Sequence, residues 1–193
     1  GVDVEVCMTS KDCKCGTDRI AEMLKKLNIA PETVVVNIQG DEPLINPEHI
    51  DKVANLLIDS GADMSTLCAE ISEIKDVFDP NCVKVVMDCN GMALYFSRAP
   101  IPYERDNFKS EHVSELHYPH YHHIGIYGYK AKTVVAYSAM DQAEIEKCES
   151  LEQLRLLNLG YKIAVGITDR PPETGVDTAD DLARINEILK RNH

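Results

Sequence analysis

Residues 34–43 read VVVNIQGDEP, and this stretch decides how the whole sequence is interpreted. Three valines favour a β-strand, and the apolar run then stops on an amide, a glycine and two acids. An uninterrupted apolar strand is typical of a parallel sheet that is covered on both faces. Ligands of such sheets bind beyond the carboxyl ends of the strands, so residues 39–42 form a candidate site. Composition alone equally permits a simple turn there.

The overall composition limits the possible functions. A chain of 193 residues with 44% hydrophobic content can bury one good core, within the usual range of a single domain. It has 20 basic and 32 acidic side chains, for a net charge of -12. A nucleic-acid binder needs a surplus of Lys and Arg, so no nucleic-acid partner is expected. No apolar run approaches the roughly 18 residues that span a bilayer, so we expect no membrane segment.

The seven cysteines cannot all pair with one another. Most are scattered through apolar segments, which indicates reduced thiols in a cytoplasmic protein. Cys13 and Cys15 form a Cys-x-Cys pattern that could hold a soft metal ion, although no second cysteine pair lies at zinc-finger spacing.

The first part of the chain alternates helical and extended patterns. Residues 17–27 carry apolar side chains at helical spacing with charges between them, which predicts an amphipathic helix. Asn46 precedes a proline, a typical helix start, and Gly61 is expected to end that helix. Residues 33–38 and 64–71 are the expected strands on either side. We expect one domain over the whole chain, 1–193.

An antiparallel insertion is predicted at about residues 83–137. Two apolar stretches, 83–88 and 92–97, flank an Asn-Gly pair, which is a strong signal for a tight hairpin. A loop rich in proline, histidine and charge follows, and then a strand at residues 123–129. The aromatic edge of this ribbon suits the pairing of two subunits.

The last part of the chain predicts helix, strand and helix. Residues 144–159 show helical periodicity and end before Gly160, a typical stop. Residues 162–167 are an expected strand, and Thr178 begins a capping-box pattern before the final helix.

Two acids occur in similar contexts far apart in the chain. Asp41 follows the apolar strand, and Asp177 ends a loop just before the final helix. Two carboxylates on separate loops at one sheet edge could bind a hard cation and bridge it to substrate phosphates. Asp177 could instead stabilise the helix start, because acids there suit the helix dipole.

Five stretches, in the same order and with similar spacing, carry a family resemblance: VVVNIQGDEPLI, NCVKVVMDCNGMALYFSRAPIPYERD, HHIGIYGYK, ESLEQLRLL and TGVDTADDL. Together they resemble the CMP-Kdo synthetases, also called 3-deoxy-manno-octulosonate cytidylyltransferases. The resemblance implies a Rossmann-like nucleotidyltransferase fold, with a mixed, mostly parallel sheet and an antiparallel insertion that forms a homodimer. It also implies that CTP activates the eight-carbon acid sugar Kdo, with release of pyrophosphate, for lipopolysaccharide biosynthesis.

The resemblance assigns roles around the reacting groups. Asp41 and Asp177 would hold Mg²⁺ between the triphosphate and the sugar, and Gln39 would lie against the reacting groups. Gly16, Thr17 and Arg19 resemble the segment that approaches the cytidine.

The resemblance also assigns residues to the acid sugar. Arg98 in YFSRAP would pair with the Kdo carboxylate, because a guanidinium can make two hydrogen bonds to it. His123, Tyr127, Glu152 and Gln153 would contact sugar hydroxyls. By composition alone, Arg98 could be a surface residue, Tyr127 a core aromatic and Glu152 part of a solvated helix face.

This sequence departs from the family pattern at two places. Family members begin with a strand and a basic, glycine-rich loop that holds the triphosphate, and no such stretch occurs here. About two βα units, each about 30 residues long, are expected to be missing. We therefore expect weak or no turnover from this chain. Cys13 and Cys15 replace a histidine and a serine of the family, which leaves nucleotide choice open.

Three alternatives remain at this stage. The chain could be a related CMP-sialic or pseudaminic acid synthetase, which would use the same metal chemistry. It could also be an inactive scaffold that supplies a dimer surface. A Cys/His metal-binding module is the third, since His117, His120, His122 and His123 lie close together in the sequence.

Overall fold

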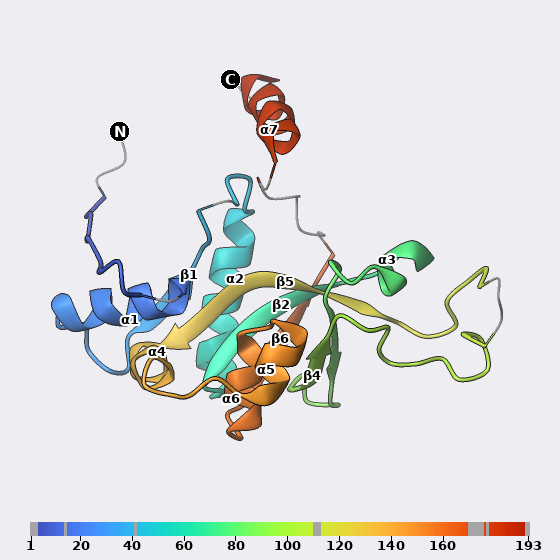
Figure 1. Cartoon of the computed structure of the whole chain (residues 1–193), viewed down its shortest axis with the longest axis horizontal. Helices are drawn as coiled ribbons and strands as arrows, with labels where there is room; N and C mark the ends of the chain where they lie inside the picture. Colours follow the sequence, from blue (N-terminus) through green and yellow to red (C-terminus); the bar gives the residue numbers. More distant parts are fainter. Residues whose placement is uncertain are drawn as a thin grey trace.

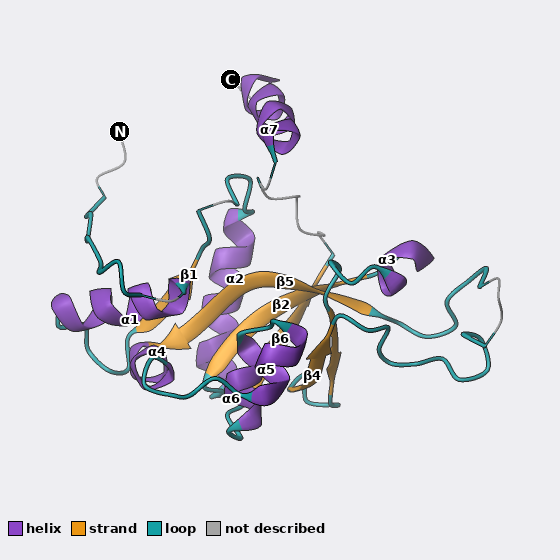
Figure 2. Cartoon of the chain, in the orientation of Figure 1, coloured by secondary structure: helices purple, strands orange, loops and turns teal. Residues whose placement is uncertain are grey.

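The computed structural model describes residues 4–13, 15–40, 42–109, 113–169, 176 and 178–191. Its helices are α1 (Gly16–Lys26), α2 (Pro47–Ser60), α3 (Ile74–Phe78), α4 (Ala131–Tyr137), α5 (Glu144–Glu149), α6 (Gln153–Asn158) and α7 (Ala179–Arg191). Its strands are β1 (Val34–Asn37), β2 (Met64–Glu70), β3 (Lys84–Met87), β4 (Ala93–Ser97), β5 (Tyr121–Lys130) and β6 (Ile163–Thr168). Figures 1 and 2 show the helices arranged around the twisted strands.

The described strands join one mixed sheet in the order β4-β3-β5-β2-β6, with β1 also paired to β5. β5 runs antiparallel to β1, β2 and β3, whereas β2 is parallel to β6 and β3 is antiparallel to β4. Strands β1, β2, β3 and β6 therefore point the same way. The predicted mixed α/β sheet is confirmed. Most of its strands point the same way, although most pairs of neighbouring strands are antiparallel.

One edge of β5 is shared by two strands. β2 pairs along almost the whole of the other edge, so β1 and β3 must lie end to end on this one. β1 ends where Asn37 pairs with Tyr127, and β3 begins where Lys84 pairs with His122. The sheet therefore has a break opposite residues 124–126 of β5.

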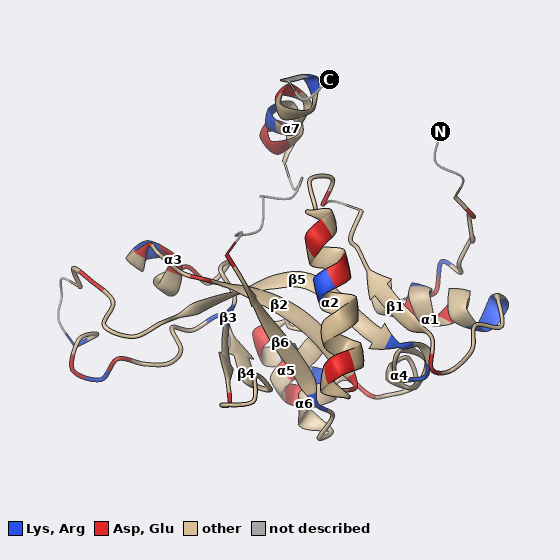
Figure 3. Cartoon of the chain, turned by 180° about the vertical axis from the view of Figure 1, so that it is seen from behind, with Lys and Arg blue, Asp and Glu red and all other residues tan. Residues whose placement is uncertain are grey.

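Alternate side chains of β2 enter two separate cores. Leu67 and Ala69 pack with Val53 of α2 on one face of the sheet. Met64 and Cys68 belong to a larger core on the other face, which includes residues of α1, α4 and α6. This two-residue alternation is what a central strand with helices on both faces requires. Acidic residues outnumber basic ones along α2, in keeping with the net negative charge (Figure 3).

Several local predictions are confirmed. The Asn46 side chain accepts a hydrogen bond from Glu48 N at 3.0 Å, and Gly61 ends α2 in the left-handed conformation with φ 64°. The Asn-Gly hairpin joins β3 to β4. Thr178 Oγ1 accepts from Asp181 N at 3.2 Å while Asp181 accepts from Thr178 N, which completes the expected capping box.

Other predictions need correction. The helix expected over residues 144–159 is broken into α5 and α6, because Ser150 adopts a left-handed conformation with φ 53°. β1 is only half-buried, since among the described strands it pairs with β5 alone. β1 and β2 are not neighbours either, because β5 lies between them. β5 is thus a central strand rather than part of a peripheral insertion.

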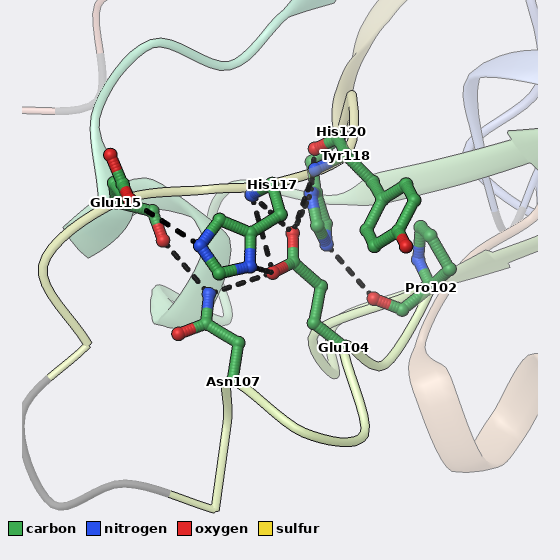
Figure 4. A network of polar contacts seen from close by, with 7 residues as sticks. All are labelled: Pro102, Glu104, Asn107, Glu115, His117, Tyr118 and His120. Carbon is green, nitrogen blue, oxygen red and sulfur yellow. Dashed lines mark hydrogen bonds and ion pairs between the residues drawn. The ribbon is translucent and has the colours of Figure 1, made fainter.

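Glu104 organises the loop that follows β4 (Figure 4). Its side chain is only 3% exposed and accepts hydrogen bonds from Asn107 Nδ2, His117 N and Tyr118 N. Burial raises the pKa of the Glu104 carboxyl, but these hydrogen bonds lower it by more, so the pKa lies below its usual value. The carboxylate therefore ties the outgoing and returning arms of the loop together.

The histidine run does not converge on one site. Both ring nitrogens of His120 lie 2.9 Å from backbone carbonyls, those of Tyr118 and Pro102. Among the described residues, no group of three or more His, Cys, Asp or Glu side chains is arranged to hold a metal ion. All seven cysteines are free thiols. No helix in the described ranges is long and apolar enough to cross a membrane.

Gly128 marks the tightest contact between β5 and α2, and it yields a prediction. A Cβ atom there would lie 2.5 Å from Ser65 Oγ and 3.1 Å from Val53 O, which already hydrogen-bond to each other. We expect Gly128→Ala to lower the free energy of unfolding by about 1–3 kcal/mol, the usual cost of overpacking a core. Urea denaturation measures this value. Gly40→Ala is the control, because nothing lies within 4 Å of its Cβ position, and equal stability of the two variants would contradict the prediction.

Candidate active site

A cleft of about 540 Å³ opens at the break in the sheet. Its walls come from the end of β1, the residues before β3, the middle of β5, the start of α1 and the turn between α5 and α6. The lining residues are Gly16, Thr17, Ile20, Asn37, Ile38, Gln39, Gly40, Asn81, Val83, His122, His123, Gly125, Tyr127, Ser150, Leu151, Glu152 and Gln153. Seven residues that the sequence singled out, from four distant segments, therefore line one cleft: Gly16, Thr17, Gln39, His123, Tyr127, Glu152 and Gln153.

Gln39 lies at the wall that the end of β1 provides. Its Nε2 is 3.5 Å from the carbonyl oxygen of Gly125, a long hydrogen bond that reaches across the break in the sheet. A Cβ atom on Gly125 would lie 3.4 Å from the same amide nitrogen. The Gln39 side chain therefore has a defined place against β5, with its amide oxygen available to a ligand.

His123 is held by Thr66 beneath the cleft. Its Nε2 lies 3.0 Å from Thr66 Oγ1, which is also within hydrogen-bond distance of the carbonyl oxygens of Ile124 and Ile126. A hydroxyl has a single proton, and the two carbonyls can only accept, so the arrangement favours Nε2–H as the donor to Thr66. Nδ1 is then an acceptor for a ligand hydroxyl. Burial lowers the pKa of His123 to about 3, which keeps the ring neutral.

Tyr127, Glu152 and Gln153 form a polar wall next to His123. The Tyr127 hydroxyl donates to Gln153 Oε1 at 3.4 Å, and Thr17 Oγ1 donates to Glu152 Oε2 at 3.0 Å. Burial raises the pKa of the Tyr127 hydroxyl, and the Glu152 carboxylate raises it further. The tyrosine therefore stays protonated and can act as a donor, whereas the carboxylate accepts.

Ser150 explains how the chain presents this wall. Its left-handed conformation, φ 53°, is unusual for a residue other than glycine and ends α5 abruptly. α6 begins only a few residues later, so residues 150–153 form a sharp turn at the cleft. In an unbroken helix, the consecutive residues Glu152 and Gln153 would point about 100° apart, whereas this turn places both in the lining of the cleft.

Arg98 lies beside the cleft rather than in its lining. Its Nε donates to the carbonyl oxygen of Glu149 at 2.7 Å, and Nη1 donates to that of Pro80 at 2.8 Å. These acceptors directly precede Ser150 and Asn81, which line the cleft. Among the described residues, Nη2 has no hydrogen-bond partner. A carboxylate at this rim would therefore meet Nη2 rather than the whole guanidinium edge.

Arg19 and the cysteines of the same segment point elsewhere. Arg19 Nη1 donates to Thr9 Oγ1 and to the carbonyl oxygen of Ser10, so it anchors the N-terminal segment to α1. The Cys13 thiol donates to Glu22 at 3.1 Å, and this hydrogen bond raises its pKa. The described structure thus places Gly16 and Thr17 at the cleft but leaves Arg19 outside its lining.

Asp41 and Asp177, the expected metal ligands, lie outside the described residues. Gly40, the residue before Asp41, lines the cleft directly after β1. β1 and β6 point the same way, so their carboxyl ends lie at the same edge of the sheet.

Comparisons with known proteins agree with this geometry. The family model described as "Cytidylyltransferase" matches residues 1–163. The chain belongs to the cytidylyltransferase family. A curated 3-deoxy-manno-octulosonate cytidylyltransferase from Aliivibrio fischeri (strain MJ11) is 47% identical, over 99% of this chain and 76% of the relative. The enzyme of the same name from Aliivibrio salmonicida is 48% identical, over 98% of this chain and 76% of the relative.

A solved structure is similar to this cytidylyltransferase in its fold. It is that of a CMP:2-keto-3-deoxy-manno-octonic acid synthetase complexed with CTP. The TM-score is 0.84 at 34% sequence identity, and the match covers 97% of this chain and 73% of the other. The fold class expected from the sequence is therefore confirmed.

Sequence reasoning missed part of the cleft of this cytidylyltransferase. Asn81, Val83 and His122 line it because β3 begins at the break and not because of any local pattern. Ser150 gave no signal either, since helical periodicity runs through it. Gly125 was the one with a usable signal, because a glycine inside a strand often marks a bulge or a close approach.

Protonation of His123 should reduce stability in acid. Its pKa is about 3 in the folded protein and about 6.5 in an unfolded chain, so the unfolded state binds the proton first. The contribution of neutral His123 to the free energy of unfolding is complete above pH 6.5. It falls as the pH drops towards 3, by up to about 1.4 kcal/mol per pH unit. Between pH 6.5 and 5 we expect His123→Asn to lose about 2 kcal/mol less unfolding free energy than the wild type. Urea denaturation at the two pH values measures this, and an equal loss in the variant and the wild type would contradict the prediction.

Proposed function

We propose that this cytidylyltransferase transfers a cytidylyl group from CTP to Kdo, giving CMP-Kdo and pyrophosphate for lipopolysaccharide biosynthesis in the cytoplasm. The observation that carries the proposal is the shared cleft. Residues implied as sugar and nucleotide contacts come from α1, the end of β1, β5 and the α5–α6 turn, and they line one space. The names of the relatives support the same substrates.

The polar groups of the cleft suit a sugar with many hydroxyls. Neutral His123 and ionised Glu152 are acceptors, Tyr127 is a donor, and Gln153 can do both. Such a mixture binds hydroxyl groups, each of which donates one hydrogen bond and accepts others. Arg98 at the rim supplies the cation that an acid sugar requires.

The reaction itself depends on charge and position rather than on a covalent nucleophile. The anomeric hydroxyl of the sugar attacks the α-phosphorus of CTP, and pyrophosphate leaves. Both reactants are anions, so a cation between them lowers their repulsion. Asp41 and Asp177 would hold Mg²⁺ there, where it would lower the pKa of the attacking hydroxyl. Gln39, fixed against Gly125, would orient the reacting groups from the end of β1.

Calorimetry of sugar binding tests this proposal directly. The primary measurement is the heat of Kdo binding with CTP and Mg²⁺ present. We expect Asp41→Asn and Asp177→Asn each to weaken binding at least tenfold, which corresponds to about 1.4 kcal/mol. EDTA should weaken wild-type binding in the same way. Asp59→Asn, at an exposed acid of α2, is the matched control. Binding that is insensitive to both aspartates and to EDTA would contradict the metal site.

The choice of sugar has a separate test. A CMP-sialic or pseudaminic acid synthetase would use the same metal chemistry, so competition among acid sugars distinguishes the alternatives. We expect Kdo to displace sialic and pseudaminic acids from the cleft. A chain that binds none of these sugars, and shows no metal-dependent heat with CTP, would instead be an inactive scaffold.

We also propose that the protein forms a homodimer through β4. β4 lies at the end of the sheet, and its Leu94 is 61% exposed. An exposed strand at a sheet edge readily pairs with another chain, and an exposed apolar side chain there favours a partner over water.

Substitution of Leu94 tests the dimer. We expect light scattering to show a dimer for the wild type and a monomer for Leu94→Lys, because a buried lysine would oppose association. The control is Ile58→Lys on α2, whose side chain is 62% exposed in the same way but lies outside the proposed interface. A monomeric wild type, or a Leu94→Lys variant that remains dimeric, would disprove this interface.

A further inference from the structure

Arg98 is held by four hydrogen bonds from its backbone and its guanidinium. Besides the two bonds from its guanidinium, its backbone N donates to Glu149 Oε2 at 2.9 Å. Its carbonyl oxygen accepts from Lys84 Nζ at 2.7 Å. Both ends of the residue are therefore anchored without any ligand, and a long, flexible side chain is restricted to one place at the rim of the cleft.

Lys84 is an unusual residue for its position. It lies in β3 between valines and is 0% exposed, although a lysine is seldom fully buried. Its ammonium group donates to the carbonyl oxygens of Asp79 and Arg98, both at 2.7 Å. Burial lowers the pKa of Lys84, while the nearby Asp79 and Glu149 carboxylates oppose that change. Nothing in the packing of an apolar strand requires this charge, and its two hydrogen bonds connect β3 both to the residues before it and to the backbone of Arg98.

Glu149 holds Arg98 from the side opposite to Lys84. Its carboxylate accepts from Ser97 Oγ at 2.6 Å and from Arg98 N, and its backbone carbonyl accepts from Arg98 Nε. Glu149 is also the last residue of α5, next to the strained turn at Ser150. The end of β4 is thereby joined to the turn that presents the sugar-binding wall.

We propose that Lys84 and Glu149 are positioning residues, which hold Arg98 at the rim of the cleft in the orientation that receives the carboxylate of an acid sugar. The inference rests on the proposed function for the identity of the ligand. The pre-organised geometry itself is independent of any ligand. Fixing Arg98 in advance avoids the loss of side-chain freedom that a flexible side chain undergoes on binding.

The first test needs no substrate. The Nε–H signal of Arg98 in a ¹⁵N spectrum of the free protein is identified as the one missing from Arg98→Lys. We expect this proton to exchange slowly with water in the wild type, and at least tenfold faster in Lys84→Met. Lys75→Met, which removes the same charge from an exposed site on α3, should leave it unchanged. An Arg98 signal unaffected by Lys84→Met would overturn the positioning role.

The second test compares Kdo with its neutral carboxamide by calorimetry. We expect Lys84→Met to weaken Kdo binding about tenfold and carboxamide binding less than twofold. In an Arg98→Ala background, Lys84→Met should cause no further loss, because both changes remove the same interaction. Equal weakening of both ligands would overturn the proposal. A wild type that binds neither ligand, but shows the expected exchange rates, would refute the proposed sugar while the positioning role stands.

Glu149→Gln provides a second variant in case Lys84→Met does not fold. Ser97 Oγ and Arg98 N donate to different oxygens of Glu149, and glutamine replaces one of these oxygens with an amide nitrogen, which cannot accept. We expect circular dichroism to show a folded protein, with faster Arg98 exchange and a selective loss of Kdo over the carboxamide. Wild-type values for both measurements would exclude Glu149 from the proposed role.

Discussion

The shared edge of β5 is the constraint on which the rest of the structure depends. A ten-residue strand is long enough for two shorter strands to pair with the same edge, one at each end. Between β1 and β3, no third strand of the described chain pairs with this edge of β5. The backbone and side chains of β5 therefore face a cleft there. The site is therefore a consequence of strand lengths and register, and it is as rigid as the sheet that forms it. Residues on such a scaffold keep their positions more closely than residues on free loops.

A layer of buried polar groups supports that cleft from beneath. Thr17 holds Glu152, and burial together with the Glu152 carboxylate raises the pKa of Tyr127, Tyr129 and Tyr137. These tyrosines remain neutral, so one carboxylate is placed among groups that can donate to it or to a ligand. Burying such groups stabilises the fold little, and the Tyr137 hydroxyl has no partner among the described atoms. Buried polar groups that stabilise the fold so little are typical of sites that recognise a ligand.

Sequence patterns failed where function imposes its own geometry. The helix expected over residues 144–159 has sound periodicity, yet Ser150 breaks it, because the turn has to present Glu152 and Gln153. Lys84 looked like an ordinary member of an apolar strand, and only the structure shows that its ammonium group donates to the carbonyls of Asp79 and Arg98. β1 was expected to be fully buried and is not, since burial depends on neighbouring strands rather than on its own valines.

The sequence by itself determined the local elements and the family. Caps at Asn46 and Thr178 and the Asn-Gly hairpin depend on interactions between residues close in the chain, so short patterns are sufficient to predict them. The family resemblance also named seven of the residues that line the cleft. Tertiary structure alone decided that β5 separates β1 from β2, that the break between β1 and β3 forms the site, and that Arg98 is held by Lys84. Those features depend on register and on contacts between distant segments, which no local pattern records.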